Sequence, residues 1–559
     1  MAGDEVSVAV NGGTVMGRHQ PASAAHPKAL DVFYGMPYAT VERFQPAVMV
    51  PPPRSGTLRA VEPGPSQPFP MAPHDTAESP LRLNIFRPCT CSSAPRPPSP
   101  GGGGGDGSGS GRKGRLLPVL VYIHGGGFNF GHPLERDLAA LVAWAPVDVL
   151  VVSVGYRLGA LGFLTEGGGE RNLGLRDQRT ALEWVREWVR GFGGDGGDVT
   201  LMGVSAGAHS IGHHILSPSP LPFRKSILES GSPTARSVLA AAHPRPTAQL
   251  ASLNSHARGK PLASLPVDDL LDASLMVWAD NMASVCWPFQ PVVDGGPGGG
   301  GIIPDAPLKL WDDAARSGRM RDQAVITGFC SHEGTSFVPQ RAATNAAFLS
   351  FFKTLIPSLA PADLAALERL YPDPVTHPSS PYANPPQSRS RYGAQFTRLH
   401  EAYAHYAYIC PVLHTAHSLS CAGATVYLYE YAALAPPFFA ASHGDQAAVV
   451  AHDMALLRGK PGLADVAGAM NARWTRFTAS ADGTLDEALW PRFVSPFDGR
   501  GQPNGRLLVF GDGNDEAAGG LGKGTPVKTR TLTEREMEQC RFWWDRMELS
   551  QGMGVRSSL

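Results

Sequence analysis

The stretch of residues 198–217, DVTLMGVSAGAHSIGHHILS, constrains the fold of this chain more than any other part of the sequence. An apolar and β-branched run at residues 199–202 is typical of a buried strand, and the small residues after it allow a sharp turn into a helix. Ser205 stands at this turn, with Gly203 and Gly207 two residues away on either side. So tight a turn brings backbone against both glycine positions and strains the serine itself. The pattern predicts a nucleophile elbow, with Ser205 at the carboxyl end of a sheet strand.

The sequence on both sides of the elbow alternates between strand and helix patterns. Residues 177–189 have the spacing of an amphipathic helix, with Leu182, Val185 and Val189 on one face. Apolar runs of strand length are at residues 116–123, 147–154, 224–230, 323–328 and 425–431. Alternation of this kind predicts an α/β fold, with a mostly parallel central sheet and helices on both faces.

Size and charge narrow the classes of function. A chain of 559 residues suggests two or three domains by length alone, but the alternation favours the exception, one large α/β domain over residues 1–559. The formal net charge of −1 provides no electrostatic footprint for nucleic acid or for an anionic membrane surface. No apolar run approaches the roughly 20 residues of a spanning helix. We therefore expect no nucleic-acid partner and no stable membrane association.

The N-terminal sequence and the cysteines indicate in which cellular compartment the protein is expected. Residues 1–21 have no basic region followed by a continuous apolar run, and instead predict a strand, a turn at residues 11–13 and a second strand. The seven cysteines form an odd set without metal-ligand spacing, since Cys89 and Cys91 have no second pair. We therefore expect a cytoplasmic protein whose cysteines are reduced thiols and which binds no metal.

Two low-complexity segments interrupt the chain. Residues 92–115, SSAPRPPSPGGGGGDGSGSGRKGR, cannot bury enough apolar area to offset the entropy of ordering them. We expect a disordered surface insertion between two strands rather than a domain boundary. Residues 295–301 form a similar, shorter segment.

A serine hydroxyl becomes a good nucleophile only with a base, an orienting carboxylate and donors for the developing oxyanion. The candidates for the oxyanion donors come first along the chain. Residues 124–128, HGGGF, directly follow a predicted strand, and successive glycines let backbone N–H groups approach a substrate carbonyl. We expect the amides of Gly126, Gly127 and Ala206 to form the oxyanion hole.

Candidates for the acid and the base follow later strands. Glu333 lies just past the predicted strand at residues 323–328, at the end of a sheet where functional side chains gather in α/β folds. For the base, physical reasoning leaves His443 and His452 open, because each has an aspartate within two residues and either could also belong to a metal site. The chain order Ser205, Glu333, His443 is the order that nucleophile-elbow folds use.

Ordered sequence blocks over nearly the whole chain resemble the type-B carboxylesterase/lipase family of α/β-hydrolases, which also includes the cholinesterases. The blocks include FYGMPYA, LRLNIFRP, HGGGF, GYRLGALGFL, GVSAG, ILESGSP, PVVDG, HEGTSF, SHGD and CRFWW. The resemblance implies a Ser205, Glu333, His443 triad, so it selects His443 over His452. It also implies the same three oxyanion donors and no cofactor.

The resemblance further places Ser230 behind the triad. It also suggests two buried ion pairs as structural features, and the partners are Arg43 with Glu78 and Arg157 with Asp177. This sequence departs from the family at Val204, where an acidic residue is usual. A second departure is at residues 62–78, where five prolines and no cysteine replace the disulfide-closed loop that holds the lid in lipases of the family.

Taken together, the residues and the resemblance predict a serine ester hydrolase that works through an acyl-enzyme on small, soluble esters. A lipolytic enzyme of the hormone-sensitive type also places HGGG before its elbow, but the Glu333 block and CRFWW argue against it. Some proteins of the family keep the fold without the triad and bind partners. Because all three triad positions are filled here, we favour an enzyme.

Overall fold

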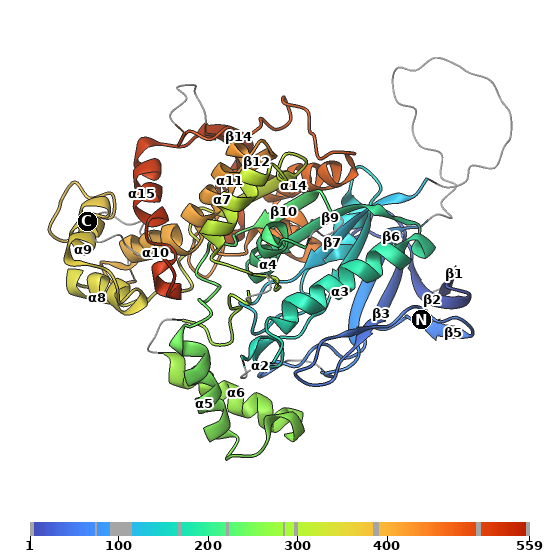
Figure 1. The fold of residues 1–559 in the computed structure, drawn as a ribbon. Coiled ribbons are helices and arrows are strands. Elements are labelled where there is room, and N and C mark those ends of the chain that lie inside the picture. Colours follow the sequence, from blue (N-terminus) through green and yellow to red (C-terminus); the bar gives the residue numbers. More distant parts are fainter. Residues whose placement is uncertain are drawn as a thin grey trace.

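The computed structural model describes residues 5–72, 75–89, 115–165, 169–219, 223–282, 286–295, 300–383, 391–498 and 505–554. The strands of these residues form one sheet in the order β1-β2-β3-β6-β8-β7-β9-β10-β11-β12-β13-β14, with β4 beside β3 and β5 beside β2 (Figure 1). The strands are β1 (Glu5–Val10), β2 (Gly13–Gln20), β3 (Leu30–Thr40), β4 (Val48–Met49), β5 (Thr57–Arg59), β6 (Leu81–Pro88), β7 (Leu117–Ile123), β8 (Leu150–Val154), β9 (Gly194–Val204), β10 (Lys225–Glu229), β11 (Ala324–Cys330), β12 (Thr425–Tyr431), β13 (Arg506–Asn514) and β14 (Lys523–Thr531).

The middle of the sheet is parallel and its edges are antiparallel. Every neighbouring pair from β8 through β7, β9, β10, β11 and β12 to β13 is parallel. The pairs β1–β2, β2–β3, β3–β6, β6–β8 and β13–β14 are antiparallel. The predicted α/β class with a mostly parallel sheet is confirmed, as is the N-terminal hairpin, whose turn at Asn11 and Gly12 has positive φ angles.

Helices cover both faces of the parallel strands, which explains why those strands are apolar throughout. In β7, Val119 and Val121 contribute to one buried cluster and Leu120 and Tyr122 to the other. The first cluster includes residues of α3 (Leu173–Trp188), α4 (Ala206–Leu216), α7 (Pro307–Ser317) and α11 (Cys410–Cys421). The second includes residues of α1 (Leu138–Trp144), α12 (Gln446–Val450) and α14 (Pro461–Ala479).

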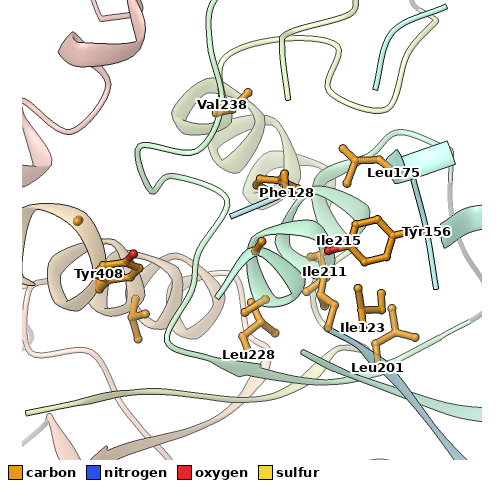
Figure 2. Close-up of a cluster of buried hydrophobic side chains, with 14 of the residues drawn as sticks. Ile123, Phe128, Tyr156, Leu175, Leu201, Ile211, Ile215, Leu228, Val238 and Tyr408 are labelled. Carbon is orange, nitrogen blue, oxygen red and sulfur yellow. The ribbon is translucent and has the colours of Figure 1, made fainter. Parts of the chain in front are cut away.

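The expected amphipathic helix is α3. Its buried face includes Leu182 and Val185, and Val189 is buried in the 3₁₀ turn that continues it. Under the elbow, Ile211 and Ile215 of α4 lie toward Ile123, Leu201 and Leu228 of the sheet (Figure 2). Burying a side chain of this size stabilises the fold by about 1.5–3 kcal/mol, so these contacts hold α4 firmly against the strands.

Several elements stand outside the predicted alternation. The hairpin of β13 and β14 extends the sheet near the C-terminus, and α5 and α6 lie side by side away from the sheet (Figure 1). The remaining α-helices are α2 (Gly159–Phe163), α5 (Pro244–His256), α6 (Val267–Asn281), α8 (Asn345–Leu355), α9 (Pro361–Leu370), α10 (Phe396–Ala404), α13 (Met454–Leu457) and α15 (Glu534–Trp544).

Both ion pairs suggested by the resemblance form. Arg157 and Asp177 are fully buried and share two hydrogen bonds, of 2.8 and 2.7 Å. The Arg43–Glu78 pair also has a hydrogen bond of 2.9 Å from Nε to Oε2, but it is only partly buried, since its side chains keep 11% and 24% of their exposure. The expectation of burial is therefore wrong for the second pair, because it lies at the edge of the fold.

Two expectations concern segments that the structure describes only in part. The predicted insertion at residues 92–115 lies outside the described residues except for Arg115, and four residues of the segment 295–301 lie outside as well. Among the residues that are described, no helix combines the length and the apolar character needed to cross a membrane. The described cysteines form no disulfide with one another.

Candidate active site

Ser205 joins β9 to α4 in a strained conformation. Its φ is 55° and its ψ is −121°, a region that non-glycine residues rarely adopt. A Cβ at Gly203 would lie 2.6 Å from the carbonyl carbon of Gly207, and a Cβ at Gly207 would overlap the carbonyl oxygen of Ile123. The backbone amide of Ser205 donates to the carbonyl of Glu229, at 2.9 Å. The expected crowding at both glycines and the strain at the serine are thus present.

Glu333 and His443 lie in contact at the carboxyl end of the sheet. Glu333 follows β11, and its buried Oε2 is 2.5 Å from Nδ1 of His443, while its Oε1 accepts from the amide of Cys330 at 2.7 Å. In a neutral imidazole that donates from Nδ1, the other ring nitrogen is unprotonated. Nε2 of His443 has no hydrogen-bond partner among the described residues. It is therefore able to accept a proton.

Aromatic side chains hold the His443 ring in this position. The ring of Tyr408 is centred 4.3 Å away, and that of Phe337 lies edge-on at 5.3 Å. Both restrict the rotation of the imidazole, and the Glu333 contact fixes its remaining torsion. No hydrogen bond joins Oγ of Ser205 to His443 within the described part of the chain, although both residues line one cavity. Such contacts are often long before a substrate is bound.

The second candidate base lies elsewhere. His452 is stacked on Trp144 with ring centroids 3.9 Å apart, and burial lowers its pKa. It is not among the described residues that line the cavity with Ser205. The structure thus brings His443, and not His452, together with Glu333.

Three amides of the expected oxyanion hole surround the elbow. Gly126 and Gly127 have φ angles of 97° and 57°, and a Cβ at either residue would overlap a neighbour, the carbonyl of Phe130 or the ring of Trp287. Ala206 begins α4 directly after the serine. None of the three amides donates to another described residue. Donors at the start of a helix and in a glycine loop are suited to a negatively charged oxygen.

Ser230 is the residue that the resemblance places behind the triad. It is buried, and its Oγ accepts from Nε2 of Gln446 at 3.4 Å. Gln446 in turn accepts from the thiol of Cys330 at 2.9 Å. This short chain of hydrogen bonds ties the strand ends of β10 and β11 to the segment that carries His443.

Asp445 adds a carboxyl group beside the histidine. Burial raises its pKa to about 7, with a contribution from nearby Glu333, even though its carboxylate accepts from the amide of Ser442 at 2.7 Å. Two carboxyl groups this close resist being ionised together. The negative charge of Glu333 therefore disfavours ionisation of Asp445, in the same direction as burial does.

An ion pair that the sequence did not indicate lies under the elbow. Arg136 and Glu229 are buried, with 1% and 0% of side-chain exposure, and Nη2 is 2.5 Å from Oε2. The other carboxylate oxygen of Glu229 accepts from Nε1 of Trp474 at 2.8 Å. The pair therefore supports the same residue whose carbonyl holds the Ser205 amide.

A cavity of about 950 Å³ opens over Ser205 and His443. Its wall includes Val204, where the resemblance leads one to expect an acidic residue, but Glu135 lines the same cavity. The carboxylate of Glu135 accepts from the hydroxyl of Tyr122 at 3.0 Å and from the amide of Gly125 at 3.4 Å. A negative charge is thus present near the glycine loop although position 204 is apolar.

One possible set of metal ligands lies away from this cavity. Within the described ranges, His19, Asp31 and Cys89 are the one group of three or more such residues whose ligand-type atoms all lie within 4.8 Å of one another. The guanidinium of Arg87 donates to Asp31 at 3.0 Å. Because that positive charge already occupies the carboxylate, the set is poorly suited to a cation.

Comparison with known proteins gives a family match over most of the chain. A family model described as "Carboxylesterase family" matches residues 4–500. Secreted lipase 4 of Gibberella zeae is 34% identical over 335 residues, which cover 56% of this chain and 57% of that protein.

Two other relatives match shorter stretches. Cholinesterase 2 of Branchiostoma lanceolatum is 33% identical over 39% of this chain and 65% of its own length, and a probable N-octanoylanthranilate hydrolase, AqdA2, of Rhodococcus erythropolis is 40% identical over 32% and 37%. The matches thus span between 37% and 65% of the lengths of these three relatives. With the elbow, the glycine loop and the sheet order all in place, the match over residues 4–500 leads to one conclusion: the chain belongs to the carboxylesterase family.

Proposed function

We propose that this protein is a serine-dependent carboxylic ester hydrolase, with Ser205 as nucleophile, His443 as base and Glu333 as the orienting acid. The main support is the 2.5 Å contact between Nδ1 of His443 and the Glu333 carboxylate, at the wall of the cavity that also contains Ser205. A base oriented by a buried carboxylate beside a strained, cavity-facing serine is the arrangement that acyl transfer needs.

The reaction has two halves. Nε2 of His443 removes the proton from Oγ of Ser205 while Oγ attacks the ester carbonyl, and Glu333 stabilises the imidazolium that forms. The amides of Gly126, Gly127 and Ala206 donate to the oxyanion. His443 then gives its proton to the departing alcohol, which leaves an acyl group on Ser205. A water molecule activated by His443 releases the acid and restores the serine.

We propose small, soluble esters as the substrates. In lipases a mobile lid exposes apolar surface at a lipid interface. Here the corresponding residues 62–72 and 75–78 contain no helix, and a bridge between Ser66 and Thr76 closes the loop. Prolines fix φ along this segment, so we infer that the segment forms a semi-rigid rim and not a mobile lid. A cytoplasmic location stays a prediction, and the relative from Gibberella zeae is named a secreted lipase.

Replacing Ser205 by alanine tests the assignment. We expect kcat for a soluble aryl ester to fall roughly 10⁴- to 10⁶-fold, as in other triad knockouts, and covalent labelling by a fluorophosphonate to disappear. Ser255→Ala, at an exposed serine of α5, is the matched control and should keep both properties. Labelling or turnover that persists in Ser205→Ala would show that another residue is the nucleophile.

A further inference from the structure

A second, smaller pocket also reaches Ser205. It has a volume of about 40 Å³ and lies between the oxyanion glycine Gly127, the ring of Trp287 and the side chains of Arg236 and Ser237. The ring of Trp287 packs so closely on Gly127 that no side chain would fit there. Unlike the large cavity, the small pocket is not lined by His443 within the described residues.

This difference indicates which part of an ester enters each space. The departing alcohol must lie beside His443, because the imidazolium gives it a proton. The alcohol therefore occupies the large cavity, which His443 lines. The acyl group, on the other side of the carbonyl carbon, then points into the small pocket.

The small pocket carries a permanent positive charge. Arg236 lines it, and an arginine side chain stays protonated at any pH that proteins experience. Its Nη1 is 3.9 Å from Sγ of Cys286, and its guanidinium carbon lies 5.1 Å from the centre of the Tyr403 ring. These contacts hold the guanidinium at the pocket wall.

The other described groups that line the pocket add no negative charge. No Asp or Glu side chain is among the described residues that line it. Burial lowers the pKa of His209 to about 3, so this histidine is neutral at ordinary pH. The buried hydroxyl of Ser237 has no hydrogen-bond partner in the described part of the chain. The pocket thus combines a guanidinium with an unused hydroxyl donor.

The large cavity is richer in acidic groups. Its lining includes Glu135, Asp137, Asp445 and Asp453, together with Arg136 and with Arg236, which lines both spaces. The guanidinium of Arg136 is paired with buried Glu229. An anionic acyl group is therefore favoured where Arg236 faces the small pocket, because no acidic side chain of the described residues lines that pocket.

Resting on the ester hydrolysis proposed above, we propose that the pocket of Arg236 and Ser237 binds a carboxylate at the far end of the acyl group, so that the substrates are monoesters of short dicarboxylic acids. A volume of about 40 Å³ holds roughly three water-sized spheres. This suits the one methylene and the carboxylate that a malonyl group places beyond its ester carbonyl. The planar guanidinium matches a carboxylate with two parallel hydrogen bonds.

The step itself is ordinary hydrolysis. With monoethyl malonate, Oγ of Ser205 forms a bond to the ester carbon and the bond from that carbon to the ethoxy oxygen breaks. Ethanol leaves with the proton held by His443, and water then releases malonate from the serine. The distal carboxylate stays bound at Arg236 throughout and is chemically unchanged.

The test compares two ethyl esters of the same shape. Monoethyl malonate carries the carboxylate, and ethyl 3-methylbutanoate replaces it with an isopropyl group. We expect Arg236→Met to lower the ratio of their kcat/KM values (malonate over 3-methylbutanoate) about 10- to 100-fold, the range expected when a hydrogen-bonded charge pair is lost. Arg236→Lys should recover part of that ratio. Arg369→Met, at an exposed arginine of α9, should leave it unchanged.

A second measurement does not depend on a variant. Malonate should inhibit hydrolysis of the neutral ester by the unaltered protein at least tenfold more strongly than 3-methylbutanoate does. A ratio of kcat/KM values that is the same before and after Arg236→Met, or equal inhibition by the two acids, would overturn the inference. If the protein hydrolyses the neutral ester but not monoethyl malonate, the carboxylate site is refuted and the esterase assignment stands. If neither ester reacts and Ser205 is not labelled, the proposed function itself fails.

Discussion

Replacement of Glu229 by glutamine removes one charge from the ion pair beneath the elbow. The substitution keeps the shape of the side chain, and the amide oxygen can still accept from Trp474. Arg136 loses the carboxylate at 2.5 Å while its own side chain remains 1% exposed. A positive charge is then left buried without the partner that compensates its lost hydration.

The size of the effect follows from this burial. Breaking a buried pair by removing one partner costs about 3–5 kcal/mol of unfolding free energy. An exposed pair is worth only about 0–1 kcal/mol. Glu487 and Arg506 form such a pair, with 57% and 49% of their side chains exposed and 3.0 Å between Nη2 and Oε1. Glu487→Gln makes the same chemical change at the surface and is the matched control.

Urea unfolding is the suitable assay, because the midpoint reports stability when the slope is unchanged. We expect Glu229→Gln to lower the midpoint clearly and Glu487→Gln to leave it almost unchanged. The double variant Arg136→Met/Glu229→Gln should be more stable than Glu229→Gln alone, since it leaves no uncompensated charge. A loss below 1 kcal/mol in Glu229→Gln, or no recovery in the double variant, would refute this account.

Three further predictions concern the site. His443→Ala should lower kcat by several orders of magnitude, whereas His452→Ala should keep a kcat near that of the unaltered protein. The opposite result in the two kcat measurements would assign the base to His452. Asp445 has its pKa raised to about 7 in the folded protein, so its contribution to stability is present below about pH 4 and is lost as the pH rises through 7. Asp445→Asn should therefore flatten the urea midpoint between pH 4 and 7, and equal slopes before and after the substitution would contradict the raised pKa. The rate with a sparingly soluble ester should saturate below its solubility limit, whereas a jump when the emulsion forms would indicate a lipase.

Local geometry made part of the site predictable from the sequence. The elbow needs only a strand, a helix and small residues at fixed offsets, so the strained φ of Ser205 follows from Gly203 and Gly207. The same holds for the glycine loop after β7. These features depend on neighbours within a few residues, and the sequence shows such neighbours directly.

Contacts between residues far apart in the chain were harder to predict from the sequence. Glu333 and His443 are 110 residues apart, and the residue types alone could not separate His443 from His452; the family resemblance made that choice. Arg136 and Glu229 are 93 residues apart and meet only because β7, which precedes Arg136, and β10, which ends in Glu229, both pair with β9. Arg236 was not recognised because a single arginine after ILESGSP has no local pattern.

The C-terminal hairpin was also missed, for a different reason. β13 reads RLLVFGDGN and ends in glycine and polar residues, and β14 reads KGTPVKTRT with almost no apolar alternation. Period-two alternation marks a strand only where one face is buried. β14 is exposed along much of its length, so its strand character comes from pairing with β13 and not from its own sequence.

The composition of β14 has a consequence for how copies of this protein meet one another. In the described part of the chain β14 is the last strand of the sheet, so its outer backbone groups could pair with a strand of a second molecule. Pro526 has no amide hydrogen to donate, and Lys523, Lys528 and Arg530 place long charged side chains along the strand. Lys528 is paired with Asp512, and Arg530 with Glu430 and Glu536. A second β14 aligned on this edge would crowd these charged groups and lack a hydrogen bond at the proline. The strand that closes the sheet thus also protects the protein against edge-to-edge aggregation at high concentration.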